Sequence, residues 1–202
     1  FAGAPFTMLS YLLEGKLTKD LSIVKRWMFE KPEVVHQWLD YLAVATGKYL
    51  DAQVEAGADA VQLFDTWAGA LSVEDYQIFA LPYARKALSL VTSPSIYYVN
   101  GVSAVLDFAA SVGAQCLSVD WRMNLSEARR RVPQVMAIQG NLDPLALHLP
   151  KAQIRERVLK MCESYGYGPG HIVNLGHGIV PSIPEDAVKV FIDSVHEFRL
   201  KA

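Results

Sequence analysis

The stretch Ala56–Gly69, A-G-A-D-A-V-Q-L-F-D-T-W-A-G, indicates how the chain folds. Its run Ala60–Phe64 is short, apolar and rich in residues that favour strands. It follows a long segment, Pro32–Ala56, whose apolar residues recur with a period close to 3.6, as in an amphipathic helix. The polar side chains of Asp65 and Thr66 come directly after it. We therefore predict a helix, then a buried strand that ends in residues able to do chemistry.

The same alternation of helical patterns and short apolar runs recurs along the chain. Repeated β-α units predict a parallel sheet with crossover helices, and nearly continuous apolar strands predict burial on both faces. The expected strands are Phe1–Phe6, Ala60–Phe64, Ser95–Val99, Gln115–Val119, Val135–Gln139 and His171–Leu175. The expected helices are Pro32–Ala56, Val73–Val91, Gly101–Ser111, Ser126–Val132, Lys151–Tyr165 and Pro184–Arg199.

This pattern predicts an α/β fold of one particular type. No G-x-G-x-x-G follows a strand and no G-x-x-x-x-G-K-[ST] occurs, which disfavours a dinucleotide or P-loop site. A (β/α)8 barrel fits better, although it has eight strands and usually about 250 residues. We therefore predict a partial (β/α)8 TIM-like barrel with the later units only, forming a single domain over residues 1–202.

Composition excludes several classes of function. The chain has 202 residues, 51% hydrophobic content, 20% charged residues and a formal net charge of −2. Without a basic excess, a nucleic-acid partner is not expected. Cys116 and Cys162 lie far apart in unlike contexts, which argues against a disulfide framework and favours a cytoplasmic location. No apolar run approaches the roughly 18–20 residues of a membrane span, so no membrane partner is expected.

Polar residues gather just past the expected strand ends, where parallel sheets and barrels place their sites. Thr66 offers a hydroxyl that can bind an anionic oxygen, or that caps the next helix. Asp65 is either a general base or a residue that holds the loop. Asp143, before Pro144, is typical of a turn or a helix N-terminus.

The first segment, F-A-G-A-P-F-T-M-L-S-Y-L-L-E-G, is a second candidate binding region. Small residues around Gly3 leave backbone amides open to a ligand, and Pro5 fixes a bend. Tyr11 lies about one helical turn into the next element, where its phenol can donate to a carboxylate. The alternative is an ordinary strand–turn–helix junction with Tyr11 at the edge of the core.

His177 lies between two glycines in V-N-L-G-H-G-I, residues 173–179. Glycines remove side-chain bulk and permit φ > 0, so the backbone can hold the imidazole close to a ligand. The alternative is a loop histidine bonded to a neighbouring carbonyl. The other four histidines are more typical of surface or structural positions. A metal site needs two or three convergent ligands, and His177 has no neighbouring H-x-C or C-x-x-C partner, so no metal is expected.

Together these motifs resemble uroporphyrinogen decarboxylase. The resemblance rests on F-A-G-A-P-F-T at 1–7, the stretch at 56–69, G-N-L-D-P at 140–144 and V-N-L-G-H-G-I, in the family's order and spacing. It implies a distorted barrel, usually a homodimer in the cytoplasm (or the plastid of a photosynthetic eukaryote). It implies decarboxylation of the four acetate side chains of uroporphyrinogen III to coproporphyrinogen III in haem and chlorophyll biosynthesis, with no cofactor.

The resemblance also implies roles for particular residues. Phe1 and Gly3 match the segment that lines the cleft and contacts the macrocycle. Tyr11 matches a tyrosine that bonds a substrate carboxylate, and Thr66 stands where the family has serine or threonine. His177 matches a histidine near a substrate carboxylate. These five are the candidate catalytic and substrate-binding residues.

Part of the family's machinery is expected outside the chain. Its P-x-W-x-M-R-Q-A-G-R segment and an aspartate that binds the pyrrole N–H groups both precede the position of Phe1. Decarboxylation needs a protonated pyrrole as electron sink, which such a carboxylate stabilises. The acidic substrate also calls for arginines. Arg85, Arg122 and the Arg129–Arg131 cluster are expected on solvated helical faces. We therefore expect the 202 residues alone to be inactive, with Tyr11, Thr66 and His177 orienting carboxylates.

Two other functions remain open. Corrinoid-dependent methyltransferases share the barrel, but they keep a zinc-binding His-x-Cys pair where this chain has His177-Gly-Ile. The other is a non-catalytic piece that dimerises or binds tetrapyrrole.

Overall fold

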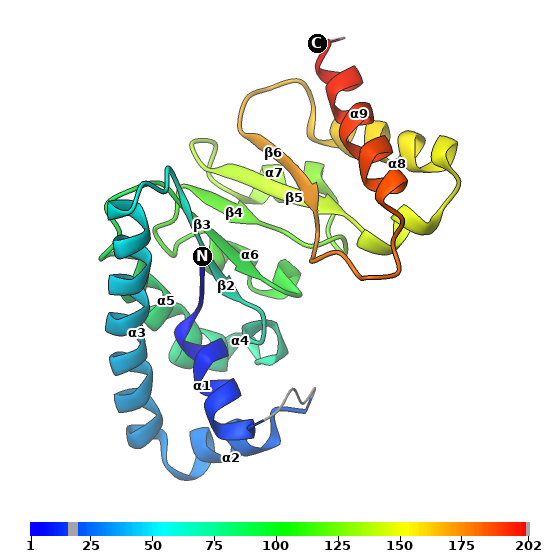
Figure 1. Ribbon diagram of the computed structural model, residues 1–202. Helices are drawn as coiled ribbons and strands as arrows, with labels where there is room; N and C mark the ends of the chain where they lie inside the picture. The colour runs from blue at the N-terminus through cyan, green and yellow to red at the C-terminus, as the bar shows by residue number, and fades with distance from the viewer. Residues whose placement is uncertain (16–19, 201–202) are drawn as a thin grey trace. The chain divides into compact units, whose positions relative to one another are not determined.

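The computed structural model describes residues 1–15 and 20–200. Strands and helices alternate along these residues (Figure 1). The strands follow one another in sequence order in the sheet, β1-β2-β3-β4-β5-β6. Two compact units make up the chain, Phe1–Leu117 and Ser118–Ala202. The α/β fold of parallel strands is therefore confirmed, whereas a single domain over residues 1–202 stays a prediction.

The first unit contains three strands and most of the helices. Its elements are β1 (Ala2–Gly3), α1 (Pro5–Glu14), α2 (Ser22–Glu30), α3 (Pro32–Glu55), β2 (Val61–Asp65), the 3-10 turn η1 (Ala68–Ala70), α4 (Val73–Asp75), the π-helical turn η2 (Tyr76–Ala80), α5 (Leu81–Leu88), β3 (Ser95–Val99), the 3-10 turn η3 (Val102–Ala104) and α6 (Leu106–Ala109). The short β4 (Cys116–Ser118) spans the boundary. The second unit continues with α7 (Leu125–Arg131), β5 (Ala137–Leu142), the 3-10 turn η4 (Pro144–His148), α8 (Lys151–Tyr165), β6 (His171–Leu175) and α9 (Glu185–Leu200).

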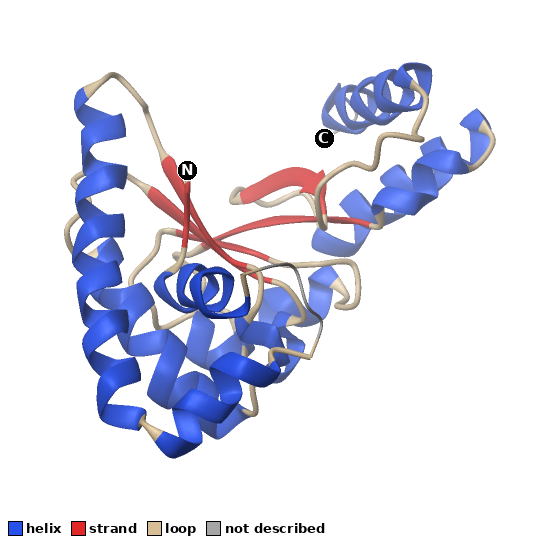
Figure 2. Ribbon diagram, turned by 60° about the horizontal axis from the view of Figure 1, so that its bottom comes forward, coloured by secondary structure: helices blue, strands red, loops and turns tan. Residues whose placement is uncertain are grey.

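Strands β1, β2 and β3 pair in parallel, with Gly3 opposite Phe64 and Phe64 opposite Tyr98. In β2 the buried residues alternate with half-buried ones, so that Leu63 and Asp65 point to one face and Phe64 to the other. Figure 2 shows the helices of this unit gathered on one side of its strands. Leu63 and Asp65, both fully buried, therefore face the helical layer.

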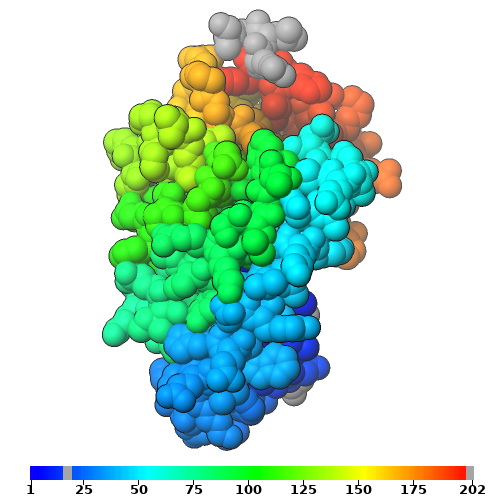
Figure 3. Space-filling view, turned by 90° about the vertical axis from the view of Figure 1, so that its left-hand side faces the viewer, coloured from blue at the N-terminus to red at the C-terminus, as the bar shows by residue number. Residues whose placement is uncertain are grey.

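Helix α3 forms the outer side of the first unit and packs against α1 and α5. Its buried residues include Val35, Leu39 and Ala43, spaced three or four apart as one helical face requires. Figure 3 views the unit from this side, where the blue-to-cyan surface of α3 lies beside the green segments that follow it. Among residues 1–15 and 20–200, no helix has both the length and the apolar character of a membrane span.

The beginning of the chain differs from the predicted strand Phe1–Phe6. Only Ala2–Gly3 is a strand, and α1 begins at Pro5. Proline is favoured at the first helical position because its fixed φ suits a helix and its missing N–H has no partner there. Helix α2 was not predicted. Its start is held by the Glu14 carboxylate, which accepts the backbone N–H groups of Ile23 at 2.8 Å and Val24 at 3.0 Å.

The predicted helix Val73–Val91 is present as α4, η2 and α5 in direct succession. The π-helical turn ends two residues before Pro82, which has no N–H to donate and whose ring would clash with the carbonyl four residues earlier in a regular helix. The widened turn accommodates that ring. Strand β3 has its predicted bounds.

In the second unit, β5 and β6 pair in parallel, with Ile138 opposite His171 and Asn141 opposite Asn174. Strand β6 and helix α8 have their predicted bounds. The strand predicted at Val135–Gln139 lies at Ala137–Leu142 instead, because the Val135 side chain is 97% exposed and the pairing extends to Leu142.

Candidate functional site

The strands of the first unit carry a row of aromatic rings around Gly3. The Phe1 and Phe64 ring centroids are 5.7 Å apart and nearly perpendicular, and Phe64 lies 5.7 Å from Tyr98 in the next strand. Phe1 is 76% exposed and Phe64 is half-buried. Gly3 adds no bulk beside Phe64, and a Cβ there would lie 2.7 Å from Sδ of Met8, the end of a flexible side chain. The result is an apolar surface that includes both Phe1 and Gly3.

Tyr11 and Thr66 lie close to this row. The Tyr11 ring packs edge-on against Trp67, with centroids 6.4 Å apart, and Trp67 directly follows Thr66 in the turn after β2. Tyr11 is 39% exposed and Thr66 is half-buried. Neither side-chain hydroxyl has a hydrogen-bond partner within the described part of the chain. Both are therefore available to a ligand.

A buried polar network holds the turn that carries Thr66. Asp65 is fully buried, and its two carboxylate oxygens accept hydrogen bonds from the Thr7 hydroxyl at 2.9 Å and the Tyr97 hydroxyl at 2.9 Å. The Trp67 backbone N–H donates to Thr7 Oγ1 at 3.2 Å. The Tyr76 and Tyr97 hydroxyls are bonded to each other at 3.2 Å. Of the two roles open to Asp65, the geometry favours holding the loop.

Burial sets the protonation behaviour of this network. Desolvation raises the pKa of Asp65 from 3.8 to about 6, while the hydrogen bonds from Thr7 and Tyr97 act in the opposite direction. Burial and the nearby Asp65 carboxylate raise the pKa of Tyr97 well above its ordinary value. The phenol of Tyr97 therefore stays protonated and remains a donor to Asp65.

Gly69 fixes the position of the same turn. A Cβ at this residue would lie 1.7 Å from the backbone oxygen of Asn100, which follows β3. No side chain fits in that space, so the loops after β2 and β3 can approach this closely only with glycine at position 69.

His177 follows β6 in the second unit. The Gly176 N–H donates to the Leu142 oxygen at 2.7 Å, and a Cβ at Gly176 would lie 2.6 Å from the backbone nitrogen of Trp121. The expected removal of side-chain bulk is therefore what Gly176 provides, whereas its φ is not in the left-handed region. The Trp121 and His177 rings meet edge-on with centroids 6.4 Å apart.

The backbone around His177 orients its ring. The Gly178 N–H donates to Nδ1 of His177 at 2.7 Å. A neutral imidazole that accepts at Nδ1 carries its proton on Nε2. His177 itself is exposed. Phe1, Gly3, Tyr11 and Thr66 thus lie together in the first unit, and His177 lies in the second.

Arg122 is exposed, as predicted, but lies in a loop and not on a helix, whereas Arg129 differs from the prediction because it is half-buried. Arg122 lies in the loop after β4, where its guanidinium pairs with the fully buried Asp120 at 3.0 Å and stacks over Trp121 at 4.5 Å. Arg129 is half-buried and donates to the Met136 oxygen at 2.8 Å. Arg129 therefore braces backbone, whereas Arg122 is held by a carboxylate and an aromatic ring. Arg122 lies four residues after the end of β4, and this position near a strand end was the available sequence signal.

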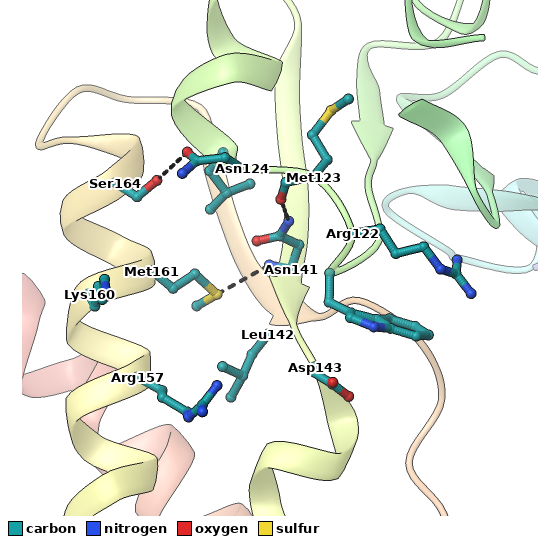
Figure 4. Close-up of a pocket in the computed structure, with 12 residues that line it drawn as sticks. Arg122, Met123, Asn124, Asn141, Leu142, Asp143, Arg157, Lys160, Met161 and Ser164 are labelled. Atoms are coloured by element: carbon teal, nitrogen blue, oxygen red, sulfur yellow. Dashed lines mark hydrogen bonds between the residues drawn. The ribbon is translucent and has the colours of Figure 1, made fainter. Parts of the chain in front are cut away.

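The sequence did not reveal a pocket in the second unit, shown in Figure 4. It has a volume of about 400 Å³ and is formed by the loop after β4, the end of β5 and one side of α8. The lining residues are Trp121, Arg122, Met123, Asn124, Leu125, Asn141, Leu142, Asp143, Arg157, Lys160, Met161 and Ser164. Within the described ranges, His, Cys, Asp and Glu side chains form no group of three that could hold a metal ion.

Comparison with known proteins assigns the chain to a family. The model of the family described as Uroporphyrinogen decarboxylase (URO-D) matches residues 1–198. The chain belongs to the uroporphyrinogen decarboxylase family. It is 43% identical to a uroporphyrinogen decarboxylase of Hahella chejuensis, over 98% of this chain and 57% of that protein. It is 44% identical to that of Desulfotalea psychrophila, over 100% of this chain and 60% of that protein. The chain thus spans about three fifths of the length of these relatives.

Solved structures support the same fold. A methyltransferase from Methanosarcina mazei superposes with a TM-score of 0.86 at 25% identity, covering 97% of this chain and 58% of that one. A putative vitamin-B12-independent methionine synthase from Listeria monocytogenes has a TM-score of 0.60 at 13% identity, covering 85% of this chain and 57% of that one. The later part of a (β/α)8 TIM-like barrel, predicted from the sequence, agrees with this family and fold.

Proposed function

We propose that the chain belongs to an enzyme that decarboxylates the four acetate side chains of uroporphyrinogen III to give coproporphyrinogen III, in haem or chlorophyll biosynthesis. The observation that carries the proposal is the family match over residues 1–198, together with curated relatives more than 40% identical. We further propose a homodimeric, cofactor-independent carboxy-lyase located in the cytoplasm, as the resemblance implies.

The first unit supports binding of a large, flat, acidic ligand. The edge-on rings of Phe1 and Phe64, with Gly3 beside them, offer an apolar surface for the macrocycle. The unpartnered hydroxyls of Tyr11 and Thr66 offer donors for its carboxylates. In this proposal both residues position the substrate, and the network around Asp65 holds the turn that carries Thr66.

His177 orients a carboxylate in the proposed reaction. The Gly178 N–H donates to Nδ1 and so orients the ring, and the imidazole is the group assigned to the substrate carboxylate. Loss of CO2 breaks a carbon–carbon bond and leaves its electron pair on the acetate carbon, where a protonated pyrrole accepts it. A carboxylate beside the pyrrole N–H groups stabilises that cation. The resemblance places this aspartate outside the 202 residues, and we propose that these residues alone bind substrate without turning it over.

The experiment measures kcat/KM for uroporphyrinogen in single-residue variants. The variants are made in an active protein that contains these 202 residues. Tyr11→Phe and Thr66→Val each remove one hydroxyl and keep the shape of the side chain. A hydrogen bond to a charged group contributes about 1.5–3 kcal/mol, so we expect each variant to lower kcat/KM by roughly tenfold or more. Tyr49→Phe, at an exposed position on α3, is the matched control and leaves kcat/KM unchanged. Wild-type kinetics in both site variants would contradict the assigned roles.

His177→Asn tests the orienting role separately. We expect lower activity, or a changed order in which the four acetates react, with substrate binding retained. Binding is measured by equilibrium titration and the intermediates by chromatography. Complete loss of activity in a normally folded variant would show instead that His177 carries an essential proton.

The likeness to the Methanosarcina mazei methyltransferase favours one alternative, a corrinoid-dependent methyltransferase. Against it, position 179 is Ile where the resemblance places a zinc-binding cysteine in those enzymes. Metal analysis of the purified protein distinguishes the two: stoichiometric zinc would support the methyltransferase, and its absence supports the decarboxylase.

A further inference from the structure

The pocket of Figure 4 has cationic groups along one wall. Arg157 and Lys160 lie three positions apart on α8, which places them one turn apart on the same helical face. Neither side chain has an ion-pair or hydrogen-bond partner within the described part of the chain. Figure 4 shows the Arg157 guanidinium extending from α8 toward Leu142. Two cations without an ion-pair partner among the described residues therefore border one cavity.

A second wall adds a further donor. The Asn124 side-chain oxygen accepts from the Ser126 backbone N–H at 2.9 Å and from the Ser164 hydroxyl at 2.8 Å. These bonds fix which end of the amide is the oxygen. The Asn124 NH2 group has no partner within the described residues. A donor is therefore held in place beside the Ser164 end of α8.

The remaining charges of the pocket leave it positive. Arg122 is already paired with Asp120. Asp143 is the one carboxylate among the lining residues, and it accepts the Leu145 backbone N–H at 2.9 Å as the cap of η4. The two unpaired cations on α8 outweigh this carboxylate. The cavity therefore attracts anions.

The pocket is larger than a simple oxyanion requires. Its volume is about 400 Å³, and part of its lining is apolar. Leu125, Leu142 and Met161 line it and are buried. The Met161 sulfur is held by the Asn141 backbone N–H at 3.2 Å, so this wall is fixed. A ligand that fills the space has an apolar body as well as an acidic group.

We propose that this pocket is a binding site for a small organic anion. The acidic group pairs with Arg157 and Lys160, and the Asn124 amide offers a donor to a polar group elsewhere on the ligand. The apolar body lies against Leu142 and Met161. This site lies wholly in the second unit, and Tyr11, Thr66 and His177 are not among its lining residues, although its Trp121 ring meets that of His177.

The test uses phenyl phosphate as the probe, titrated into purified ¹⁵N-labelled protein at low ionic strength. We expect saturable shifts of the Asn124 side-chain amide signals and of the backbone signals of Leu142 and Met161. Benzyl alcohol, which has the apolar ring without the charge, shows no saturation at the same concentrations. Inorganic phosphate, which has the charge without the ring, binds more weakly than phenyl phosphate.

Two variants distinguish binding of phenyl phosphate in the pocket from non-specific attraction of the anion to positively charged surface. The double variant Arg157→Gln with Lys160→Gln removes both positive charges. Glutamine is a good helix former at exposed positions, so we expect the fold to be retained. We expect at least a tenfold rise in the dissociation constant for phenyl phosphate. Lys48→Gln, on the exposed side of α3, removes a charge elsewhere and leaves the constant unchanged. Failure of phenyl phosphate to saturate, or equal binding by the double variant and the wild type, would overturn the proposal.

Discussion

Asp65 makes the stability of the first unit depend on pH. Its carboxyl group is fully buried, and desolvation raises its pKa from 3.8 to about 6. The folded protein therefore holds this proton to a higher pH than the unfolded chain does. The stabilisation from this group is fully present below about pH 4 and is lost as the pH rises through about 6. Asp65→Asn keeps the shape of the side chain but carries no charge at any pH.

The expected size follows from the two pKa values. At about 1.4 kcal/mol for each pKa unit, the change from 3.8 to about 6 corresponds to about 3 kcal/mol in the free energy of unfolding. Roughly 2 kcal/mol of this falls between about pH 4.5 and 7, where most proteins stay folded. As the pH rises over this range, the free energy of unfolding of the wild type should fall by about 2 kcal/mol relative to that of Asp65→Asn.

The assay is urea unfolding of both proteins at several pH values, with the free energy of unfolding compared at each. Asp59→Asn, which removes an exposed carboxylate, is the control and should keep the wild-type pH profile. Carbon NMR of the Asp65 carboxyl gives its pKa directly. Parallel pH profiles for the wild type and Asp65→Asn, or titration of this carboxyl near 4, would refute the reasoning.

Three further substitutions test the local architecture. Thr7→Val removes the donor to Asp65, so it should lower the free energy of unfolding by about 1–3 kcal/mol in urea and raise the pKa of Asp65 further, as NMR would show. Glu14→Ala removes the acceptor at the start of α2 and should destabilise by about 1–2 kcal/mol, whereas Glu14→Gln keeps most of that stability. Gly69→Ala should lower the free energy of unfolding in urea by about 3 kcal/mol, because the added Cβ meets backbone. Gly178→Ala, with open space around it, should have little effect in the same assay.

The regular elements could be predicted where a local pattern is long enough. The apolar run at Ser95–Val99 and the helical period at Lys151–Tyr165 gave the observed bounds. The first strand could not be delimited in this way because only two residues pair and Pro5 begins a helix. Helix α2 has nine residues, and the Glu14 acceptor that holds its start lies outside it, so its own period was a weak signal.

The sequence predicted those residues of the candidate site that come just after a strand. Thr66 and His177 come after parallel strands, and the resemblance added Phe1, Gly3 and Tyr11. The role of Asp65 was partly visible, since it is in phase with buried Leu63 along β2. Its partners Thr7 and Tyr97 depend on packing and strand register, which the sequence does not state. The pocket beside α8 was missed for the same reason, because three separate elements form its walls.

The most direct test of the central claim is the formation of coproporphyrinogen III from uroporphyrinogen III. The purified 202-residue chain is assayed with and without a supplied N-terminal fragment of a family member, and the products are separated by chromatography. We predict no product from the chain alone and stepwise loss of four CO2 once the fragment is present. Robust turnover by the chain alone would contradict the proposed division of the site. The absence of any decarboxylated product in both assays, from folded proteins, would contradict the proposed function.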